Sequence, residues 1–233
     1  MYLGEPAGLS STPHRVLGVS GSLDGFGSSV ASAGDINGDG YADVIVGDTI
    51  ASPGRRFQAG SAAVFLGGAA GLSSVPVRVL EGVADGDHFG QSVASAGDVN
   101  RDGRADVIVG AYGRSSGVAA SVYLADETGL PSAPHRVFQG GAIDLNTNSA
   151  TPIAGAGDLN GDGYADVILG TPLATYAGRR LAGSAAVYLG GAAGLSATAH
   201  RLFGGSEAYD LFGFSVASLA APALRSASAW PFG

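Results

Sequence analysis

A thirteen-residue segment occurs three times in this chain, and it strongly limits the folds that the chain can adopt. The copies cover residues 35–47, 98–110 and 158–170, so their starts lie 63 (35 to 98) and 60 (98 to 158) residues apart. Each copy begins with the pattern Asp-x-Asn-x-Asp-Gly-x-x-Asp and continues into apolar, mostly β-branched residues. Self-similarity at this period predicts an array of equivalent structural units.

Two further blocks repeat with the same period. An aromatic residue followed by leucine begins a block at residues 2, 65, 123 and 188, and thirteen residues later comes an arginine, at Arg15, Arg78, Arg136 and Arg201. A Phe-Gly pair lies nine residues before the first two Asp segments, at residues 26 and 89, whereas Ser149-Ala150 holds this place in the third copy. A last Phe-Gly pair begins at residue 212, but Ala221 stands where the next first aspartate is expected.

These blocks divide the chain into units. Residues 1–25 match the second half of a unit, residues 26–88, 89–148 and 149–211 are full units, and residues 212–218 match the start of another. The array therefore covers residues 1–218. The tail 219–233 has no repeat character and contains the only tryptophan. We interpret this tail as a truncation or a junction. A hydrophobic docking tail is the rival interpretation.

Each full unit contains four short strand signals. In the second unit they cover residues 91–96, 105–110, 119–124 and 135–138, which are rich in Val, Ile, Tyr and Phe and bounded by glycines. Forty glycines and a charged fraction of 14% suit short strands and tight turns rather than a helical bundle. We predict an all-β fold, a β-propeller of four-stranded antiparallel blades with three full and two partial blades, about four blade-equivalents. A β-sandwich is the rival.

The Asp segment joins the first two strands of each unit as a hairpin, and its side chains suit a hard cation. Positions 1, 3, 5 and 9 bear oxygen side chains, the glycine at position 6 lets the chain reverse, and position 7 offers its backbone carbonyl. Calcium takes roughly six to eight oxygen ligands, whereas magnesium prefers strict octahedral geometry with retained waters. We predict three calcium sites, and three Ca²⁺ ions would change the formal net charge from −8 to −2.

Two other interpretations fit the Asp segment less well. An EF-hand needs Glu at position 12 and flanking helices, but position 12 is Val46, Val109 or Leu169 within a predicted strand. A simple Asx-turn with solvated carboxylates suits one such loop, but it does not explain three copies of the whole oxygen set.

The Phe-Gly pairs followed by Asp loops resemble the FG-GAP repeat of integrin α-subunits and of bacterial surface or secreted proteins. The resemblance covers nearly the whole chain except residues 219–233, although the Gly-Ala-Pro element is poorly kept at residues 47–49, 110–112 and 170–172. It implies that the loops bind calcium on one face of a propeller that usually has seven blades. The implied ligands are Asp35, Asn37, Asp39 and Asp43; Asp98, Asn100, Asp102 and Asp106; and Asp158, Asn160, Asp162 and Asp166, to which the loop pattern adds the carbonyls of Tyr41, Arg104 and Tyr164.

Seven blades do not fit in 233 residues. Three arrangements stay open: a fragment of a longer propeller, a four-blade ring in which residues 1–25 and 212–218 share a blade, or a larger ring made with a second copy of the chain.

The resemblance implies adhesion or ligand binding, so we expect a non-enzymatic module with structural calcium and an unknown protein or glycan ligand. No signal peptide is visible. An extracellular or cell-surface location is nevertheless favoured, because the calcium concentration outside the cell fills even sites with a Kd of about 10⁻⁴–10⁻³ M. The alternative is an accessory or catalytic domain of a secreted hydrolase or lyase, with Asp85, Asp87 and Asp210 as candidate groups. A third interpretation is a degenerate chain with no independent function.

Composition argues against several other classes. The net charge is −8 without a basic cluster, which disfavours nucleic-acid binding, and the absence of cysteine excludes disulfides and thiol metal sites. No apolar run reaches the roughly 18 residues of a membrane span.

Three further patterns are interpreted as structural. His14, His135 and His200 share one repeat position, so we expect them on different blades, pointing apart. The Gly-x-Ser-x-Gly pattern at residues 113–117 lacks the helix that a hydrolase nucleophile needs after it. The arginine pairs at residues 55–56 and 179–180 are expected to be solvated loop charges.

Overall fold

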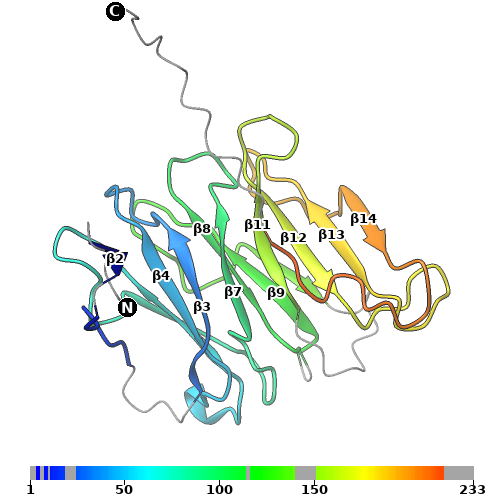
Figure 1. Ribbon diagram of the computed structural model, residues 1–233, viewed down its shortest axis with the longest axis horizontal. Helices are drawn as coiled ribbons and strands as arrows, with labels where there is room; N and C mark the ends of the chain where they lie inside the picture. The colour runs from blue at the N-terminus through cyan, green and yellow to red at the C-terminus, as the bar shows by residue number, and fades with distance from the viewer. Residues whose placement is uncertain are drawn as a thin grey trace, which may run out of the picture.

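The computed structural model describes residues 4–5, 8–9, 11–18, 25–113, 116–139 and 151–217, and it contains a row of three four-stranded antiparallel sheets (Figure 1). The first sheet comprises β3 (Phe26–Gly34), β4 (Asp43–Asp48), β5 (Ser61–Phe65) and β6 (Arg78–Glu81). The second comprises β7 (Ser92–Gly97), β8 (Asp106–Gly110), β9 (Val118–Tyr123) and β10 (Arg136–Gln139). The third comprises β11 (Ile153–Gly157), β12 (Asp166–Thr171), β13 (Ser184–Tyr188) and β14 (Arg201–Gly204).

Within each sheet the chain runs up and down through neighbouring strands, as in a propeller blade. The strands of the second sheet lie within one residue of their predicted ranges at every end. The all-β class and the four-stranded antiparallel blade are therefore confirmed. Outside the sheets, β1 (Gly4–Glu5) pairs with β2 (Gly8–Leu9), and a short 3₁₀ helix, η1 (Pro53–Arg55), lies between β4 and β5.

Several features that the sequence singled out lie outside the described residues. They are Ser149-Ala150, Ala221, the tail 219–233 with Trp230, and residues 114–115 of the Gly-x-Ser-x-Gly pattern.

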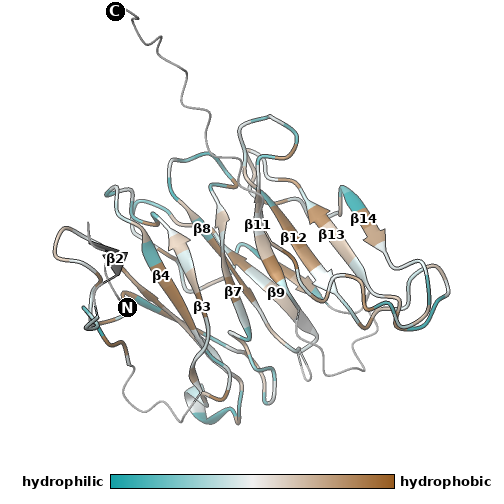
Figure 2. Cartoon of the chain, viewed as in Figure 1, coloured by the Kyte–Doolittle hydropathy of each residue, from teal (hydrophilic) through white to brown (hydrophobic). Residues whose placement is uncertain are grey.

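The second strand of the first sheet is apolar on both faces because one face packs on the second sheet and the other meets residues 11–18. Ile45 of β4 belongs to a buried cluster with Val107 and Val109 of the second sheet, whereas the adjacent Val46 belongs to a different cluster, against which Leu17 packs. Figure 2 shows brown, apolar colour along these central strands. The packing explains why the sequence here is a continuous Val-Ile-Val run instead of an alternating pattern.

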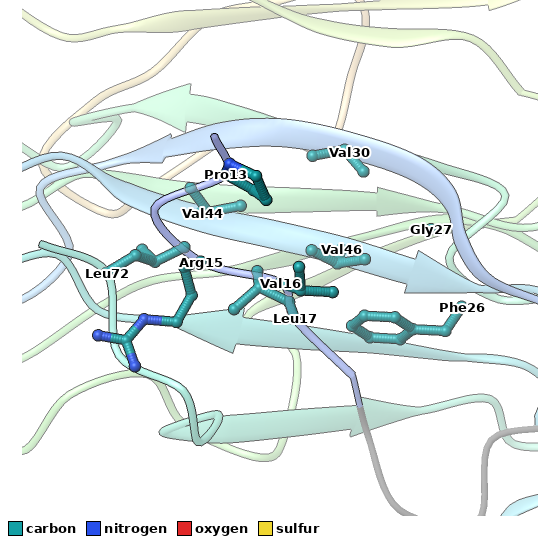
Figure 3. A pocket seen from close by; sticks show the side chains of 10 residues that line it. All are labelled: Pro13, Arg15, Val16, Leu17, Phe26, Gly27, Val30, Val44, Val46 and Leu72. Atoms are coloured by element: carbon teal, nitrogen blue, oxygen red, sulfur yellow. The ribbon is translucent and has the colours of Figure 1, made fainter. Parts of the chain in front are cut away.

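The face of the first sheet that points away from the second sheet is partly covered by residues 11–18. Arg15, Val16 and Leu17 of this segment line a cavity of about 510 Å³ together with residues of β3 and β4 (Figure 3). Val46 lies 3% exposed beneath the segment, whereas Val30 stays 63% exposed. The segment therefore buries only part of this apolar face.

Polar contacts between neighbouring blades recur at equivalent positions. Arg78 Nε donates to the carbonyl of Leu130 at 2.7 Å, and Arg136 Nε donates to the carbonyl of Leu195 at 3.0 Å. The repeated arginine thus ties the fourth strand of one blade to a turn of the next. The sequence showed the repeat of this arginine but not its partner.

The first strands of neighbouring blades are also linked. Ser29 Oγ donates to the carbonyl of Gly90 at 2.7 Å, and Ser92 Oγ donates to the carbonyl of Thr151 at 2.6 Å. In each case a serine of the first strand donates to a main-chain carbonyl of the following unit, just before that unit's first strand.

We expect Arg136→Met to weaken the contact between the second and third blades, because methionine keeps the apolar stem but loses the donor to the carbonyl of Leu195. A hydrogen bond to a charged group contributes about 1.5–3 kcal/mol. In a domain of this size that corresponds to a fall in Tm of roughly 3–10 °C, measurable by differential scanning calorimetry. The control is Arg179→Met on an exposed loop, which should leave Tm unchanged; equal Tm values for the two variants would contradict the assigned role.

Candidate metal centre in the Asp loops

The three Asp segments form the hairpin loops between the first two strands of each sheet. They connect β3 to β4, β7 to β8 and β11 to β12. The position-6 glycines, Gly40, Gly103 and Gly163, all have a φ of 88°, in the left-handed region that side-chain-bearing residues rarely adopt. The reversal that the pattern predicted at position 6 is therefore present in all three loops.

Side chains at positions 1, 3 and 5 fold back over the loop that carries them. In the first loop, Asp35 Oδ1 accepts from the amide of Asp39 at 3.0 Å and Asp35 Oδ2 accepts from the amide of Gly40 at 2.7 Å. Asn37 Oδ1 accepts from the same Asp39 amide at 3.2 Å. The side chains of Asn37 and Asp39 also meet, with Nδ2 and Oδ2 2.9 Å apart.

The other two loops repeat this arrangement. The Asn-to-Asp contact is 3.0 Å between Asn100 and Asp102 and 2.8 Å between Asn160 and Asp162. The first aspartate, Asp98 or Asp158, likewise accepts from the position-5 and position-6 amides. Three oxygen-bearing side chains are thus gathered in each loop, at the positions that the sequence pattern gave.

The position-9 aspartates have a different environment: Asp43, Asp106 and Asp166 are each 0% exposed. Asp43 Oδ2 accepts from the amide of Ile36 at 2.8 Å, and Asp43 Oδ1 accepts from the amide of Gly67 at 2.7 Å. The carboxylate therefore ties position 2 of its own loop to the turn after the third strand.

The same clamp recurs in the other two blades. Asp106 accepts from the amides of Val99 and Ala125 at 2.9 Å each. Asp166 accepts from Leu159 at 2.7 Å and from Gly190 at 3.0 Å. This anchoring role was missed in the sequence; the signal available was the repeat of an aspartate directly before an apolar strand.

Burial and neighbouring charge act together on two of the position-9 carboxylates, Asp43 and Asp106. The pKa of Asp106 is raised to about 7, first by desolvation and also by the charges of Asp102 and Asp98, against the effect of its two backbone hydrogen bonds. The pKa of Asp43 is raised by the same causes, with burial first and with Asp39 and Asp35 as the charged neighbours. A bound cation would favour the charged form of these groups.

The carboxylate and amide oxygens of each loop are the type of ligand that a hard cation prefers. In this structure these side chains accept hydrogen bonds from amides of their own loop. Among the described residues, no group of three or more His, Cys, Asp or Glu side chains stands arranged to hold a metal ion. Each loop combines two outward carboxylates with an amide oxygen, and each position-9 oxygen accepts one N–H and keeps a second acceptor site. Position 7 places Tyr41, Arg104 and Tyr164 at the same point of the three hairpins.

Neighbouring Asp loops are joined by their main chains. The amide of Ala105 donates to the carbonyl of Asp35 at 2.8 Å, and the amide of Ala165 donates to the carbonyl of Asp98 at 2.9 Å. Gly34 lies so close to Ala105 that a Cβ added to this glycine would overlap the alanine side chain. Position 1 of one loop is thus fixed to position 8 of the next.

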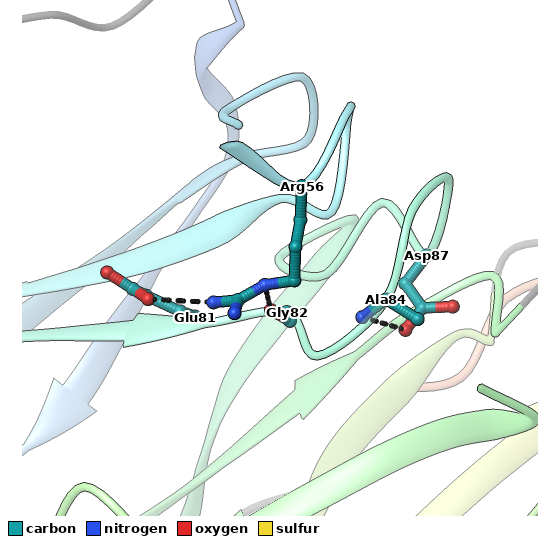
Figure 4. A network of polar contacts seen from close by, with 5 residues as sticks. All are labelled: Arg56, Glu81, Gly82, Ala84 and Asp87. Carbon is teal, nitrogen blue, oxygen red and sulfur yellow. Dashed lines mark hydrogen bonds and ion pairs between the residues drawn. The ribbon is translucent and has the colours of Figure 1, made fainter. Parts of the chain in front are cut away.

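Two of the three candidate acidic residues of the enzymatic alternative, Asp87 and Asp210, hold turns. Asp87 is 1% exposed and accepts from the amide of Ala84 at 3.2 Å (Figure 4) and from that of Ser116 at 3.1 Å. Asp210, at the equivalent repeat position, accepts from the amide of Glu207 at 2.8 Å. Beside Asp87, Arg56 donates to the carbonyl of Gly82 and pairs with Glu81 at 3.1 Å, so Arg56 is not the simple solvated charge that the sequence suggested.

The repeated histidines lie at contacts between units. His14 lies against Gly71 and His135 lies against Gly194, and in both cases a Cβ on the glycine would overlap the imidazole. Burial lowers the pKa of His135, and the charge of Arg136 adds to this effect. The two histidines thus contact separate glycine turns, one in the first full unit and one in the third.

Comparison with known proteins gives two family matches. The model of the FG-GAP repeat matches residues 26–65 and 151–188, and that of the FG-GAP-like repeat matches residues 98–169. The matched segments include all three Asp loops.

Integrin α-subunits are among the similar proteins. Integrin alpha-PS5 of Drosophila melanogaster is 30% identical over 169 residues, or 70% of this chain, and integrin alpha-7 of Homo sapiens is 33% identical over 162 residues, or 68%. Integrin alpha-IIb of Mus musculus is 40% identical over 106 residues, or 45% of this chain. The matches span only 16%, 13% and 10% of these three relatives. With three four-stranded blades and an Asp loop in each, the chain belongs to the FG-GAP repeat family.

Proposed function

We propose that this chain is a calcium-stabilised, non-enzymatic binding module with an adhesion or ligand-binding role outside the cell. The observation that carries the proposal is the threefold recurrence of one loop, with the same oxygen-bearing side chains, the same glycine reversal and the same buried carboxylate. The integrin α-subunits among its relatives support the type of module. A protein or a glycan is the proposed ligand.

In each loop the ion would be held by the side chains of positions 1, 3 and 5, the carbonyl of position 7 and the carboxylate of position 9. In the first loop these are Asp35, Asn37, Asp39, Tyr41 and Asp43. A 180° rotation of the Asn37 side-chain amide would place its oxygen at the position where its nitrogen contacts Asp39, so that the oxygen could bind the ion. Bound Ca²⁺ supplies positive charge that offsets the repulsion among three carboxylates.

Calcium suits the loops better than magnesium does. Three carboxylates, an amide oxygen and a carbonyl approach the six to eight oxygens that calcium takes, and the loops need not meet octahedral geometry. Because the carbonyl of Asp35 is bonded to the next blade, an ion that fixes one loop also stabilises the position of its neighbour.

The proposed absence of enzymatic activity rests on the turn-holding roles of Asp87 and Asp210. The proposed location rests on the relatives and on the weak calcium affinity expected of such loops. In the described part of the chain, no helix is both long and apolar enough for a membrane span.

Calcium should raise the thermal stability of the protein. For sites with a Kd of about 10⁻⁴–10⁻³ M, 10 mM calcium stabilises the fold by roughly 1.4–2.7 kcal/mol per occupied site. Three sites correspond to a rise in Tm of about 10 °C or more relative to protein in chelator, measured by calorimetry. Magnesium at the same concentration controls for ionic strength, and a Tm that is the same in calcium and chelator would reject calcium as the stabilising ion.

Two substitutions in the first loop should separate ion binding from the structural clamp. Asp39→Asn removes an outward charge but keeps an acceptor for the amide of Tyr41, so it should weaken calcium binding without lowering Tm in chelator. Asp43→Ala removes the acceptor of two backbone amides, each costing about 1–3 kcal/mol when left unpaired, so it should lower Tm even in chelator. Calorimetry with and without calcium makes the comparison; equal behaviour of the two variants in chelator would argue against distinct roles.

A further inference from the structure

The second Asp loop differs from the other two in carrying two arginines. Position 4 is Arg101 where the other loops have Gly38 and Gly161, and position 7 is Arg104 where they have tyrosine. Each loop contains three aspartates, so the formal charge is −3 in the first and third loops and −1 (−3 + 2) in the second.

The backbone at Arg101 takes a conformation that suits glycine. Its φ is 60°, close to the values of 74° and 77° at Gly38 and Gly161. A side-chain-bearing residue pays steric strain in this left-handed region, and such exceptions concentrate at functional sites. Arg101 therefore stands at a position whose backbone conformation favours glycine.

Both arginines reach toward a neighbouring loop. The guanidinium of Arg101 lies over Gly163 of the third loop: a Cβ added to this glycine would be 3.0 Å from Arg101 Nη1. The stem of Arg104 approaches Gly38 of the first loop, with Cγ 4.0 Å from where a Cβ would be. The second loop thus places a guanidinium over the third loop and an arginine stem beside the first.

The two charges have different surroundings. Arg101 is exposed, whereas Arg104 is partly buried. Asp126, after β9, lies close enough that Arg104 helps to lower its pKa, after the larger effect of hydrogen bonds from Thr128. Asp126 occupies the place of Gly68 and Gly191 in the other blades and so partly balances Arg104, while Arg101 faces the loops.

We propose that Arg101 and Arg104 act as built-in counter-ions that make the second loop a weaker calcium site than the first and third loops. The inference rests on the proposed calcium function. Calcium affinity in oxygen-rich loops follows the number of charged ligands, and a positive charge within a Debye length of the ion opposes binding. We expect the second site to bind calcium about tenfold more weakly than the first and third.

The test is isothermal titration calorimetry of calcium into the whole chain, with a double substitution that gives the second loop the residues of its neighbours. The wild type should titrate with two stronger sites and one weaker site. Arg101→Gly/Arg104→Tyr should raise the affinity of the weak site about tenfold, so that three similar sites are seen. Its Tm in chelator checks that the variant is folded.

A matched control removes the same charges elsewhere. Arg55→Gly/Arg180→Tyr introduces the same two residue types at exposed positions away from the Asp loops, and Arg55 also has a positive φ, of 67°. This control should keep the two-plus-one pattern of the wild type. If it reproduced the effect of the loop variant, total charge rather than the position of the arginines would be responsible, and the proposal would be overturned.

Different results would contradict the role of the arginines and calcium binding itself. Three equal sites in the wild type, or an unchanged weak site in Arg101→Gly/Arg104→Tyr, would overturn the role of the arginines while leaving calcium binding intact. No calcium heat in any variant, together with no terbium luminescence sensitised by Tyr41 or Tyr164, would overturn the proposed function itself. Terbium is informative here because the first and third loops carry a tyrosine at position 7 and the second does not.

Discussion

A buried carboxylate at the start of the second strand holds each blade and its loop together. Asp43, Asp106 and Asp166 accept two backbone amides each, one from the hairpin loop and one from the turn after the third strand. Without this acceptor, two amides in the interior would lack a partner, and the loop would lose its attachment to the blade. The exposed side chains of the loop are held by amides of the loop, and the buried carboxylate ties that loop to the turn after the third strand.

The same carboxylate links the fold to the proposed ion. Burial alone would favour its neutral form, as the raised pKa of Asp106 indicates, and the outward aspartates increase this tendency. A cation in the loop would reverse the balance by favouring the charged form. The proposed ion binding would therefore be coupled to fold stability through one side chain that solvent does not reach.

Much of the fold was predictable from the sequence because the same pattern of strands and loops occurs in three units. The strand ranges of the second blade, the hairpin position of the Asp loops and the reversal at Gly103 all follow from local pattern. The partner of Arg136 did not, since its acceptor is a backbone carbonyl 59 residues away that no side-chain pattern reveals. The buried position of Asp43 was not predictable either, because an aspartate at position 9 of the loop suits both a metal ligand and an acceptor for backbone amides.

Three of the recurring polar contacts between blades share one property: their acceptors are main-chain carbonyls. Ser29 bonds the carbonyl of Gly90, Arg78 that of Leu130, and the amide of Ala105 that of Asp35. A main-chain carbonyl is the same whatever side chain its residue bears. A unit can thus be duplicated or lost in a gene without a matching change in its new neighbour, and the length of such an array is free to vary over evolution while every joint keeps its bonds.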